Sequence, residues 1–360
     1  MRLALLFCLL LPTSLMAQPN PPDTLPASVE PRAVLVIHGG AGTIRRDLLD
    51  EASEASIRAA LTTALEAGYA EIQGGASAMD AVTAAITVLE DSPRFNAGRG
   101  AVFTADGYAE LDASIMDGAT GEAGAISGVR HVKNPILLAR EVMTSSPHVL
   151  LSGDGAEEFA LLRGLDLVPN RHFHTDARRE ALRRVLDQQR AQQQSESGAA
   201  DHEAIPERAV PEWQLEHPAP WRMTGTVGAV ALDNDGHLAA GTSTGGMTAK
   251  RYGRIGDSPI IGAGTFANEA VGVSSTGHGE YFIRNVTAYD IAARMRYLGE
   301  SLTQAAEAVI HETLTESGGT GGVIALGADG TVTMPFNTPG MYRGYIDEDG
   351  TVTVLLYRDE

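Results

Sequence analysis

"GTVGAVALDNDGHLAAGTSTGG", residues 225–246, has the pattern of two strands joined by a tight turn. Apolar and small residues run along both halves, as in buried strands, and the Asp235-Gly236 pair between them is typical of a hairpin. The preceding residues are rich in Gln, Ser, Glu, Ala and Pro and have no periodicity, so we expect a flexible linker over about residues 196–225. Gly225-Thr226 therefore stands where a linker ends and a strand begins.

The rest of the chain predicts strands, then helices, then strands in each half. This order is typical of an α+β protein in which sheets pack together with helices outside. Ser77 and Asp80 predict a capping box at a helix start, and Asn134-Pro135 predicts a cap followed by Pro at the first helical position. Helices are expected at about 57–72, 77–90, 135–143, 154–163, 176–195, 279–298 and 302–315, and strands at about 32–38, 109–129, 226–233, 237–246, 259–263, 271–276, 321–337 and 342–357.

The N-terminal segment "MRLALLFCLLLPTSLMAQ" has the pattern of a secretory signal peptide. Arg2 precedes a short apolar core, too short to span a bilayer, and small residues end it near Ala17. We expect cleavage after Ala17, export, and a periplasmic location if the source is a bacterium. Cys8, the only cysteine, lies in residues 1–17, so the mature chain would have no disulfide and no thiol nucleophile.

The composition is acidic. The chain has 46 Asp and Glu residues against 27 Lys and Arg residues, a formal net charge of −19. Such a charge repels nucleic acid and anionic lipid, which argues against both as partners. Many of the glycines fall in short clusters, which suits tight turns and sites lined by backbone.

Chemistry suggests a use for the Gly225–Thr226 junction. A threonine hydroxyl is a poor nucleophile at neutral pH and needs a base, whereas a free α-amino group has a pKa of about 8. If the Gly225–Thr226 bond were cut, Thr226 would carry a base on its own Cα, and no histidine would be required. From these two residues alone the alternative stays open that the pair simply begins a strand.

Five stretches together resemble the plant-type L-asparaginase / isoaspartyl peptidase family of N-terminal-nucleophile hydrolases. They are "IHGGAG" at 37–42, "LEDSPRFNAGRGAVFTADGYAELDASIMDG" at 89–118, residues 225–264, "SSTGHGEYFIR" at 274–284 and "PFNTPGMYRGY" at 335–345. The resemblance implies a four-layer αββα sandwich and autoproteolysis into an α subunit (residues 18–225) and a β subunit (residues 226–360). It further implies a heterotetramer of two αβ pairs that hydrolyses small molecules, namely isoaspartyl dipeptides and L-asparagine.

The resemblance also assigns roles to residues. Thr226 would form a β-aspartyl ester with the substrate, and Thr244 would hydrogen-bond the nucleophile. Thr276 and Gly277 match the oxyanion hole. The remaining matches are expected to bind substrate: Arg254 for the carboxylate and Asp257 for the ammonium of a free amino-acid end, together with Gly279 and Asn96.

Two features of the matched stretches are less regular. His278 stands where the family often has a small residue or Thr, which puts the local shape of the pocket in doubt. The loop from Leu89 to Arg99 matches one that binds a structural sodium ion through main-chain carbonyls, although Arg99 replaces an expected apolar residue. No cofactor is expected for catalysis. The sodium positions implied are Leu89, Glu90, Ser92, Phe95, Ala97 and Arg99.

Three other features of the sequence allow different interpretations. "GTSTG" at 241–245 fits the G-x-S-x-G elbow of α/β-hydrolases, with Asp257 and His278 in the required order, but "GGMTAKRYG" after it is a poor helix. His172 and His174 could form a metal pair, yet no third ligand is near in sequence. His38 is expected to be structural.

Two further function classes stay open. A glycosylasparaginase-like hydrolase is the close alternative, and a secreted solute-binding protein is the remote one. The binding protein would have no reason to be cut at Gly225.

Overall fold

The computed structural model describes residues 33–197 and 225–360. The expected signal peptide, residues 1–17, and residues 198–224 of the expected linker lie outside the described residues. Within the described ranges the chain mixes helices and sheets, which confirms the α+β class.

The described helices are α1 (Glu51–Gln73), α2 (Ala78–Asp91), α3 (Pro135–Ser145), α4 (Gly153–Leu162), α5 (Asp176–Ser197), α7 (Gly279–Asn285), α8 (Thr287–Ala293) and α9 (Leu302–Ala308). Short 3-10 turns are η1 (Arg46–Leu48) and η2 (Asn170–Phe173), and π-helical turns are η4 (Arg294–Leu298) and η5 (Val309–Leu314). The strands are β1 (Ala33–Gly42), β2 (Leu111–Asp117), β3 (Ala123–Val129), β4 (Leu150–Ser152), β5 (Val227–Leu232), β6 (Leu238–Thr244), β7 (Thr265–Ala267), β8 (Val271–Gly277), β9 (Gly321–Gly327), β10 (Val332–Thr333), β11 (Gly340–Asp347) and β12 (Val352–Tyr357).

The strands form two sheets. The larger has the order β12-β11-β1-β5-β6-β2-β3-β4, and the smaller has the order β10-β9-β8-β7. The predicted hairpin is confirmed: β5 and β6 pair antiparallel, and the Gly236 N–H donates to the Asp233 carbonyl at 3.0 Å. Every residue of β5 is buried, which explains its uninterrupted apolar pattern.

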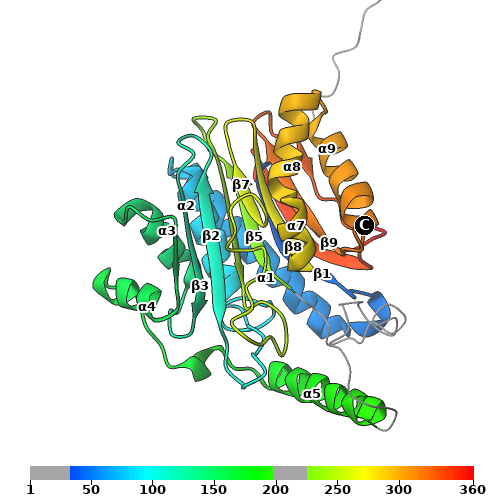
Figure 1. Cartoon of the computed structure of the whole chain (residues 1–360). Helices are drawn as coiled ribbons and strands as arrows, with labels where there is room; N and C mark the ends of the chain where they lie inside the picture. The colour runs from blue at the N-terminus through cyan, green and yellow to red at the C-terminus, as the bar shows by residue number, and fades with distance from the viewer. Residues whose placement is uncertain (1–32, 198–224) are drawn as a thin grey trace, which may run out of the picture. The chain divides into compact units, whose positions relative to one another are not determined.

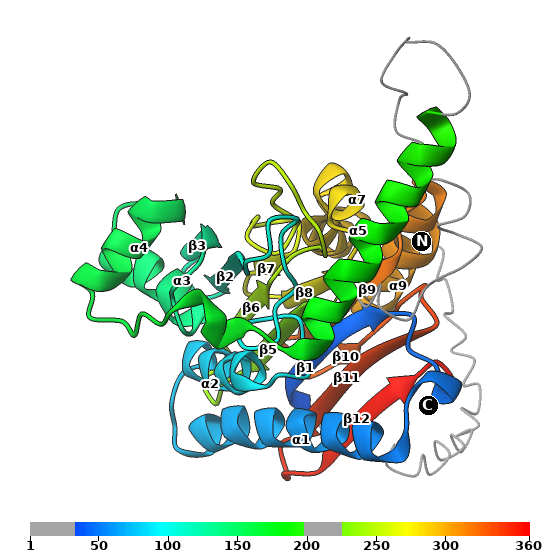
Figure 2. The ribbon, with the colours of Figure 1, turned by 90° about the horizontal axis from the view of Figure 1, so that it is seen from below.

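Three apolar clusters fill the spaces between these elements. The first packs the larger sheet against α1, α2 and α3, and the second packs the smaller sheet against α8 and α9. The third joins the two sheets, for example through Val36 of β1, Val230 of β5 and Leu326 of β9. Figures 1 and 2 show α8 and α9 beside the smaller sheet and α1 and α2 beside the larger one. β5 therefore has helices on one face and the second sheet on the other.

The capping predictions met different outcomes. The box at Ser77 and Asp80 is confirmed, because each side chain bonds the other residue's backbone. Pro135 does open α3, but the Asn134 side chain makes no cap bond there. Its Nδ2 donates instead to the Asp91 carboxylate at 3.2 Å, because the end of α2 lies beside the start of α3.

Two predictions of element boundaries were wrong. Residues 259–263 form turns instead of a strand: the Ile260 N–H donates to the Asp257 carbonyl, and the Ala263 N–H donates to the Ile260 carbonyl. The expected helix over 279–298 is broken at Val286, which adopts left-handed backbone angles (φ 50) between α7 and α8. Apolar spacing alone does not mark such a break, since Val is rarely found in that conformation.

Candidate active site

Thr226 is buried and directly precedes β5, an interior strand of the larger sheet. Its hydroxyl donates to the hydroxyl of Thr244, at the end of β6, over 3.1 Å. The Thr244 oxygen also accepts the N–H of Gly246 at 3.0 Å. Hairpin pairing of β5 with β6 brings the two threonines together, and the shared contact restricts the rotamer of the Thr226 side chain.

The Gly225–Thr226 bond is packed against the end of β1. A Cβ atom on Gly40 would lie 2.5 Å from the Gly225 Cα and 3.2 Å from the Thr226 nitrogen. Gly40 also has left-handed backbone angles (φ 114), so the close approach and the conformation both require glycine. The "HGGAG" segment therefore forms one wall beside the junction.

His38 contacts the carbonyl group of Thr226. It is fully buried, its Nδ1 lies 2.9 Å from the Thr226 carbonyl oxygen, and its Nε2 lies 3.0 Å from the Ser274 hydroxyl. Burial lowers the pKa of His38 to about 3, so the ring is neutral at ordinary pH. Because a carbonyl only accepts hydrogen bonds, Nδ1 carries the proton. The sequence suggested only a structural role here.

The expected oxyanion residues lie on β8 of the smaller sheet. The Thr276 hydroxyl accepts the N–H of Ala41 at 3.3 Å, which places it next to the Gly40 wall. Gly277 is the last residue of β8 and pairs with Gly321 of β9. The packing of the two sheets thus brings Thr276 toward the junction, from a sheet that Thr226 does not belong to.

Arg254, Asp257 and Gly279 adjoin one another. A Cβ atom on Gly279 would lie 2.8 Å from the Asp257 Oδ1 and 3.0 Å from the Arg254 Nη2. Asp257 is buried, its Oδ2 has no hydrogen-bond partner, and burial raises its pKa to about 7 even though Arg254 opposes this shift. A buried carboxylate without a partner is costly, and a ligand ammonium group would satisfy it.

Arg254 has a partner that the sequence did not reveal. Its Nε and Nη2 donate to the two carboxylate oxygens of Glu280 at 3.0 and 2.8 Å. His278 lies beside the same carboxylate, at 3.3 Å. Glu280 stands within the "GHGE" motif, but the pattern by itself does not indicate which of many acidic residues faces Arg254.

Both polar atoms of the Asn96 side chain bond backbone groups of the protein. Its Nδ2 donates to the Gly246 carbonyl at 2.7 Å, and its Oδ1 accepts the N–H of Val102 at 2.9 Å. It also lies against the junction, since a Cβ on Gly225 would be 3.4 Å from the Asn96 Cβ. This geometry ties the loop after Thr244 to the loop after α2.

The loop from Leu89 to Arg99 folds back on the end of α2. The Arg99 N–H donates to the Glu90 carbonyl at 2.7 Å, and the Arg99 side chain is exposed. The last turn of α2 contains no basic residue, so its carbonyls face no cationic side chain of their own turn. The Leu89 carbonyl likewise accepts the N–H of Ser92 at 3.3 Å, and the sodium ion implied at this loop stays a prediction.

The rival sites are not assembled. The Ser243 hydroxyl donates to buried Glu90 at 2.6 Å. The residues after Thr244 form irregular turns instead of a helix. His174 Nε2 lies 3.0 Å from the Asn170 side chain, and among residues 33–197 and 225–360 no cluster of three His, Cys, Asp or Glu side chains could hold a metal. No described helix is long and apolar enough to cross a membrane.

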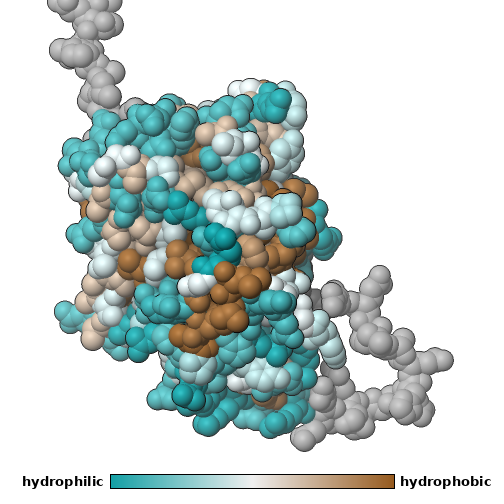
Figure 3. Space-filling model, turned by 90° about the vertical axis from the view of Figure 1, so that its left-hand side faces the viewer, coloured by the Kyte–Doolittle hydropathy of each residue, from teal (hydrophilic) through white to brown (hydrophobic). Residues whose placement is uncertain are grey.

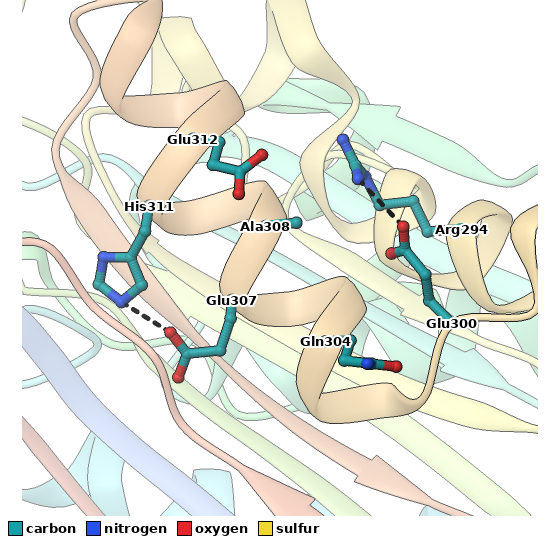
Figure 4. Close-up of a pocket in the computed structure, with 7 residues that line it drawn as sticks. All are labelled: Arg294, Glu300, Gln304, Glu307, Ala308, His311 and Glu312. Atoms are coloured by element: carbon teal, nitrogen blue, oxygen red, sulfur yellow. Dashed lines mark ion pairs between the residues drawn. The ribbon is translucent and has the colours of Figure 1, made fainter.

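A separate surface pocket lies on η4, α9 and η5 (Figure 4). Two ion pairs lie within the pocket: Arg294 lies 3.6 Å from Glu300, and His311 lies 3.0 Å from Glu307. None of the predicted site residues lines it. The pocket is therefore distinct from the cluster around Thr226.

The chain is similar in sequence to known proteins. The sequence profile of a family described as asparaginase matches residues 31–356. The chain is 48% identical over 330 residues to an "Isoaspartyl peptidase" of Escherichia coli (strain K12), covering 91% of this chain and 97% of that protein. It is 42% identical to a "Probable isoaspartyl peptidase/L-asparaginase 2" of Arabidopsis thaliana (90% and 98% covered) and to a "Plant-type L-asparaginase" of Pyrococcus furiosus (87% and 96% covered).

Proposed function

The chain belongs to the asparaginase family, and from that premise we propose that it is a hydrolase of isoaspartyl dipeptides and of the side-chain amide of L-asparagine. The observation that carries the proposal is the hydrogen bond from the Thr226 hydroxyl to the Thr244 hydroxyl. Thr226 directly follows Gly225, which is packed against Gly40. In both substrates one methylene group separates the side-chain carbonyl from the α-carbon of a free amino-acid end. That end has one carboxylate and one ammonium.

The first proposed step is self-cleavage. The Thr226 Oγ1 attacks the Gly225 carbonyl carbon, the acyl group moves from nitrogen to oxygen, and water hydrolyses the ester. Gly225 then ends in a carboxylate and Thr226 begins with a free amine. Gly40 supports this step, since any larger residue there would collide with the junction. The products are residues 18–225 and 226–360.

In turnover, the new α-amine of Thr226 accepts the hydroxyl proton as the oxygen attacks the substrate's side-chain carbonyl. The amine then passes the proton to the leaving group, and water releases aspartate from the β-aspartyl ester. Thr276 and Gly277 would donate to the developing oxyanion, where losing one donor typically costs about 2.7–4 kcal/mol of barrier.

Substrate would be held at Arg254 and Asp257. Arg254 still has the edge of its guanidinium that Glu280 does not bind, and this edge suits a carboxylate. Asp257 offers its unpartnered oxygen to the ammonium. Asn96 contributes by holding the loop of Gly246, and a sodium ion in the loop from Leu89 to Arg99 would stiffen the same region.

We also propose the finer features that the resemblance implies. The two facing sheets with outer helices support a four-layer αββα sandwich. An apolar surface over β4 and α4 supports pairing of two copies into a heterotetramer (Figure 3). Its large exposed side chains are Val149, Leu150, Leu161 and Leu162. Secretion through residues 1–17 remains a prediction.

One experiment tests the proposal. Purified protein is incubated, run on a denaturing gel and assayed for aspartate release. Self-cleavage predicts pieces of about 22 and 14 kDa, the shares of 37.9 kDa for residues 18–225 and 226–360. Thr226→Ala should remain one band and release no aspartate. An intact Thr226→Ala chain that still releases aspartate at the normal rate would overturn the proposal.

The same assay separates the alternatives. Faster turnover of a glycosylated asparagine than of a β-aspartyl dipeptide would favour the glycosylasparaginase-like function. A solute-binding protein would bind asparagine without releasing aspartate, but the relatives named as peptidases and asparaginases give that alternative no support.

A further inference from the structure

A chain of buried hydroxyl groups runs from His38 across both sheets to the substrate loop. All its members are 0–1% exposed. From His38 Nε2 the successive contacts are 3.0 Å to Ser274, 2.7 Å to Thr242, 2.5 Å to Thr265, 2.7 Å to Ser114 and 2.6 Å to the Ser258 carbonyl. We call Ser274, Thr242, Thr265 and Ser114 the hydroxyl chain. The hydroxyl chain begins at His38, which contacts the Thr226 carbonyl, and ends at the carbonyl of Ser258, the residue after Asp257.

The direction of donation along the hydroxyl chain follows from the acceptors at its two ends, His38 Nε2 and the Ser258 carbonyl. His38 is neutral and its one proton is on Nδ1, because the Thr226 carbonyl can only accept. Nε2 must then accept a proton from Ser274. Since the Ser274 proton is committed to His38, its oxygen accepts from Thr242. At the other end, Ser114 donates to the Ser258 carbonyl, which can only accept. The orientations of Ser274, Thr242 and Ser114 are therefore defined, and the single proton of Thr265 serves either Thr242 or Ser114.

Such a chain is an unusual way to fill the contact between two sheets. Apolar side chains of similar volume would pack there without needing partners, and a half-satisfied polar network is worse than an apolar core. The backbone is shaped around it as well: a Cβ on Gly228 of β5 would lie 2.0 Å from the Ser274 Oγ and 2.4 Å from the His38 Nε2. Glycine at 228 is what lets His38 reach Ser274.

We propose that His38 and the hydroxyl chain are positioning residues that fix the Thr226 carbonyl, and thereby the nucleophile, relative to the loop that carries Asp257. The proposal rests on the proposed function of Thr226. It adds residues whose action is indirect, since none of them touches the hydroxyl of Thr226. In this arrangement the hydroxyl chain sets the alignment of the nucleophile with bound substrate, and it contributes little to the affinity for substrate.

The kinetic test uses three variants and a matched control. Ser274→Ala removes the donor to His38, Thr242→Val removes the next hydroxyl with its shape kept, and Thr242→Ser restores that hydroxyl. Ser275→Ala is the control, because Ser275 is equally buried on β8 but its hydroxyl donates to the Ala263 carbonyl, at 3.4 Å, outside the hydroxyl chain. All variants are first checked for self-cleavage and for thermal unfolding.

We expect Ser274→Ala and Thr242→Val to lower kcat about 10- to 100-fold, because small misplacement of a reacting atom is costly. KM should stay within about twofold, and Thr242→Ser should recover most of kcat. Ser275→Ala should lose stability to a similar degree yet keep kcat. Equal losses of kcat in Ser274→Ala and Ser275→Ala would overturn the proposal, as would an unchanged kcat in both.

A spectroscopic readout does not depend on turnover. In protein labelled with 15N-histidine, the His38 signals are assigned by their loss in His38→Gln. They should report the Nδ1–H form with an Nε2 that accepts a hydrogen bond, and Ser274→Ala should shift the Nε2 signal. A His38 protonated on Nε2, or a signal that Ser274→Ala leaves in place, would contradict the hydroxyl chain. If Thr226 is not the nucleophile, this signature persists while the wild type releases no aspartate.

Discussion

Glu280 occupies one edge of the Arg254 guanidinium, with hydrogen bonds of 3.0 Å to Nε and 2.8 Å to Nη2. The pair is partly buried, with 19% of the Arg254 side chain and 37% of the Glu280 side chain exposed. An arginine held in this way presents its remaining edge in a fixed direction, which suits a planar carboxylate. The residue that orients the proposed carboxylate-binding group is therefore itself an acid.

This relationship predicts a selective defect in Glu280→Ala. We expect KM for a β-aspartyl dipeptide to rise about tenfold, because Arg254 loses its orientation, and kcat to change little. A substrate whose α-carboxylate is replaced by a carboxamide should show no such rise. Glu141→Gln, which loosens the remote Arg163–Glu141 pair (2.8 Å), serves as the control. A fall in KM would mean that Glu280 competes with substrate for Arg254.

The contact between Thr226 and Thr244 predicts that the hydroxyl at 244 matters more than its shape. Thr244→Val should lower turnover by about 100-fold, a typical loss when an acid–base contact is removed, and Thr244→Ser should be much less affected. The measurement is aspartate release after self-cleavage has been verified on a gel. Thr83→Val is the control, and it should keep the wild-type rate of aspartate release. Thr83 is a remote buried threonine whose hydroxyl donates to the Met79 carbonyl in α2.

Asp257 predicts the acid limb of the pH profile. Burial raises its pKa to about 7, so the carboxyl is neutral below that pH and ionised above it. The substrate ammonium requires the ionised form. We therefore expect kcat/KM, which reports the free enzyme, to rise with pH through about 7. The free α-amine of Thr226, with a pKa of about 8, must also be deprotonated and extends the increase to higher pH, whereas the step near 7 is the rise that Asp257 causes. Asp257→Asn should have a low kcat/KM without this rise. A wild-type profile flat between pH 6 and 8 would exclude Asp257 as the titrating group.

Gly40 predicts a block in maturation. Gly40→Ala would put a Cβ 2.5 Å from the Gly225 Cα, and its left-handed angles add strain. We expect the purified variant to remain a single band with little aspartate release. Gly107→Ala separates the two causes, because Gly107 also has positive φ (90) but nothing lies within 4 Å of its would-be Cβ. Cleavage of Gly40→Ala at the wild-type rate would show that the wall at the junction is dispensable.

The apolar surface over β4 and α4 predicts an assembly defect. Leu161 and Leu162 are 65% and 76% exposed, and charges placed there would be buried without partners if two copies meet on this face. Light scattering coupled to gel filtration should therefore report half the wild-type mass for Leu161→Glu/Leu162→Glu. Leu298→Glu, at another exposed leucine on η4, should keep the wild-type mass. An unchanged mass in the double variant would place the interface elsewhere.

Local pattern was sufficient wherever structure depends on neighbours in the chain. The hairpin of β5 and β6, the capping box at Ser77 and the position of Thr226 at the start of a buried strand all follow from short-range periodicity and turn chemistry. The junction itself was visible for the same reason, as an abrupt change in composition. The strand expected over 259–263 failed because an apolar run around Pro259 can be buried as turns just as well.

Only the tertiary structure decided which distant side chains meet. His38 and Ser274 are 236 positions apart, and nothing in either local pattern marks them as partners. The packing of one sheet on the other determines that contact, and it also brings Thr276 toward Thr226 and Glu280 onto Arg254. Periodicity states which face of a strand is buried, whereas the identity of the group opposite it depends on how whole sheets are placed. The sequence by itself therefore determined the strand and the candidate nucleophile at its start, and the contact between the two sheets decided which side chains surround Thr226.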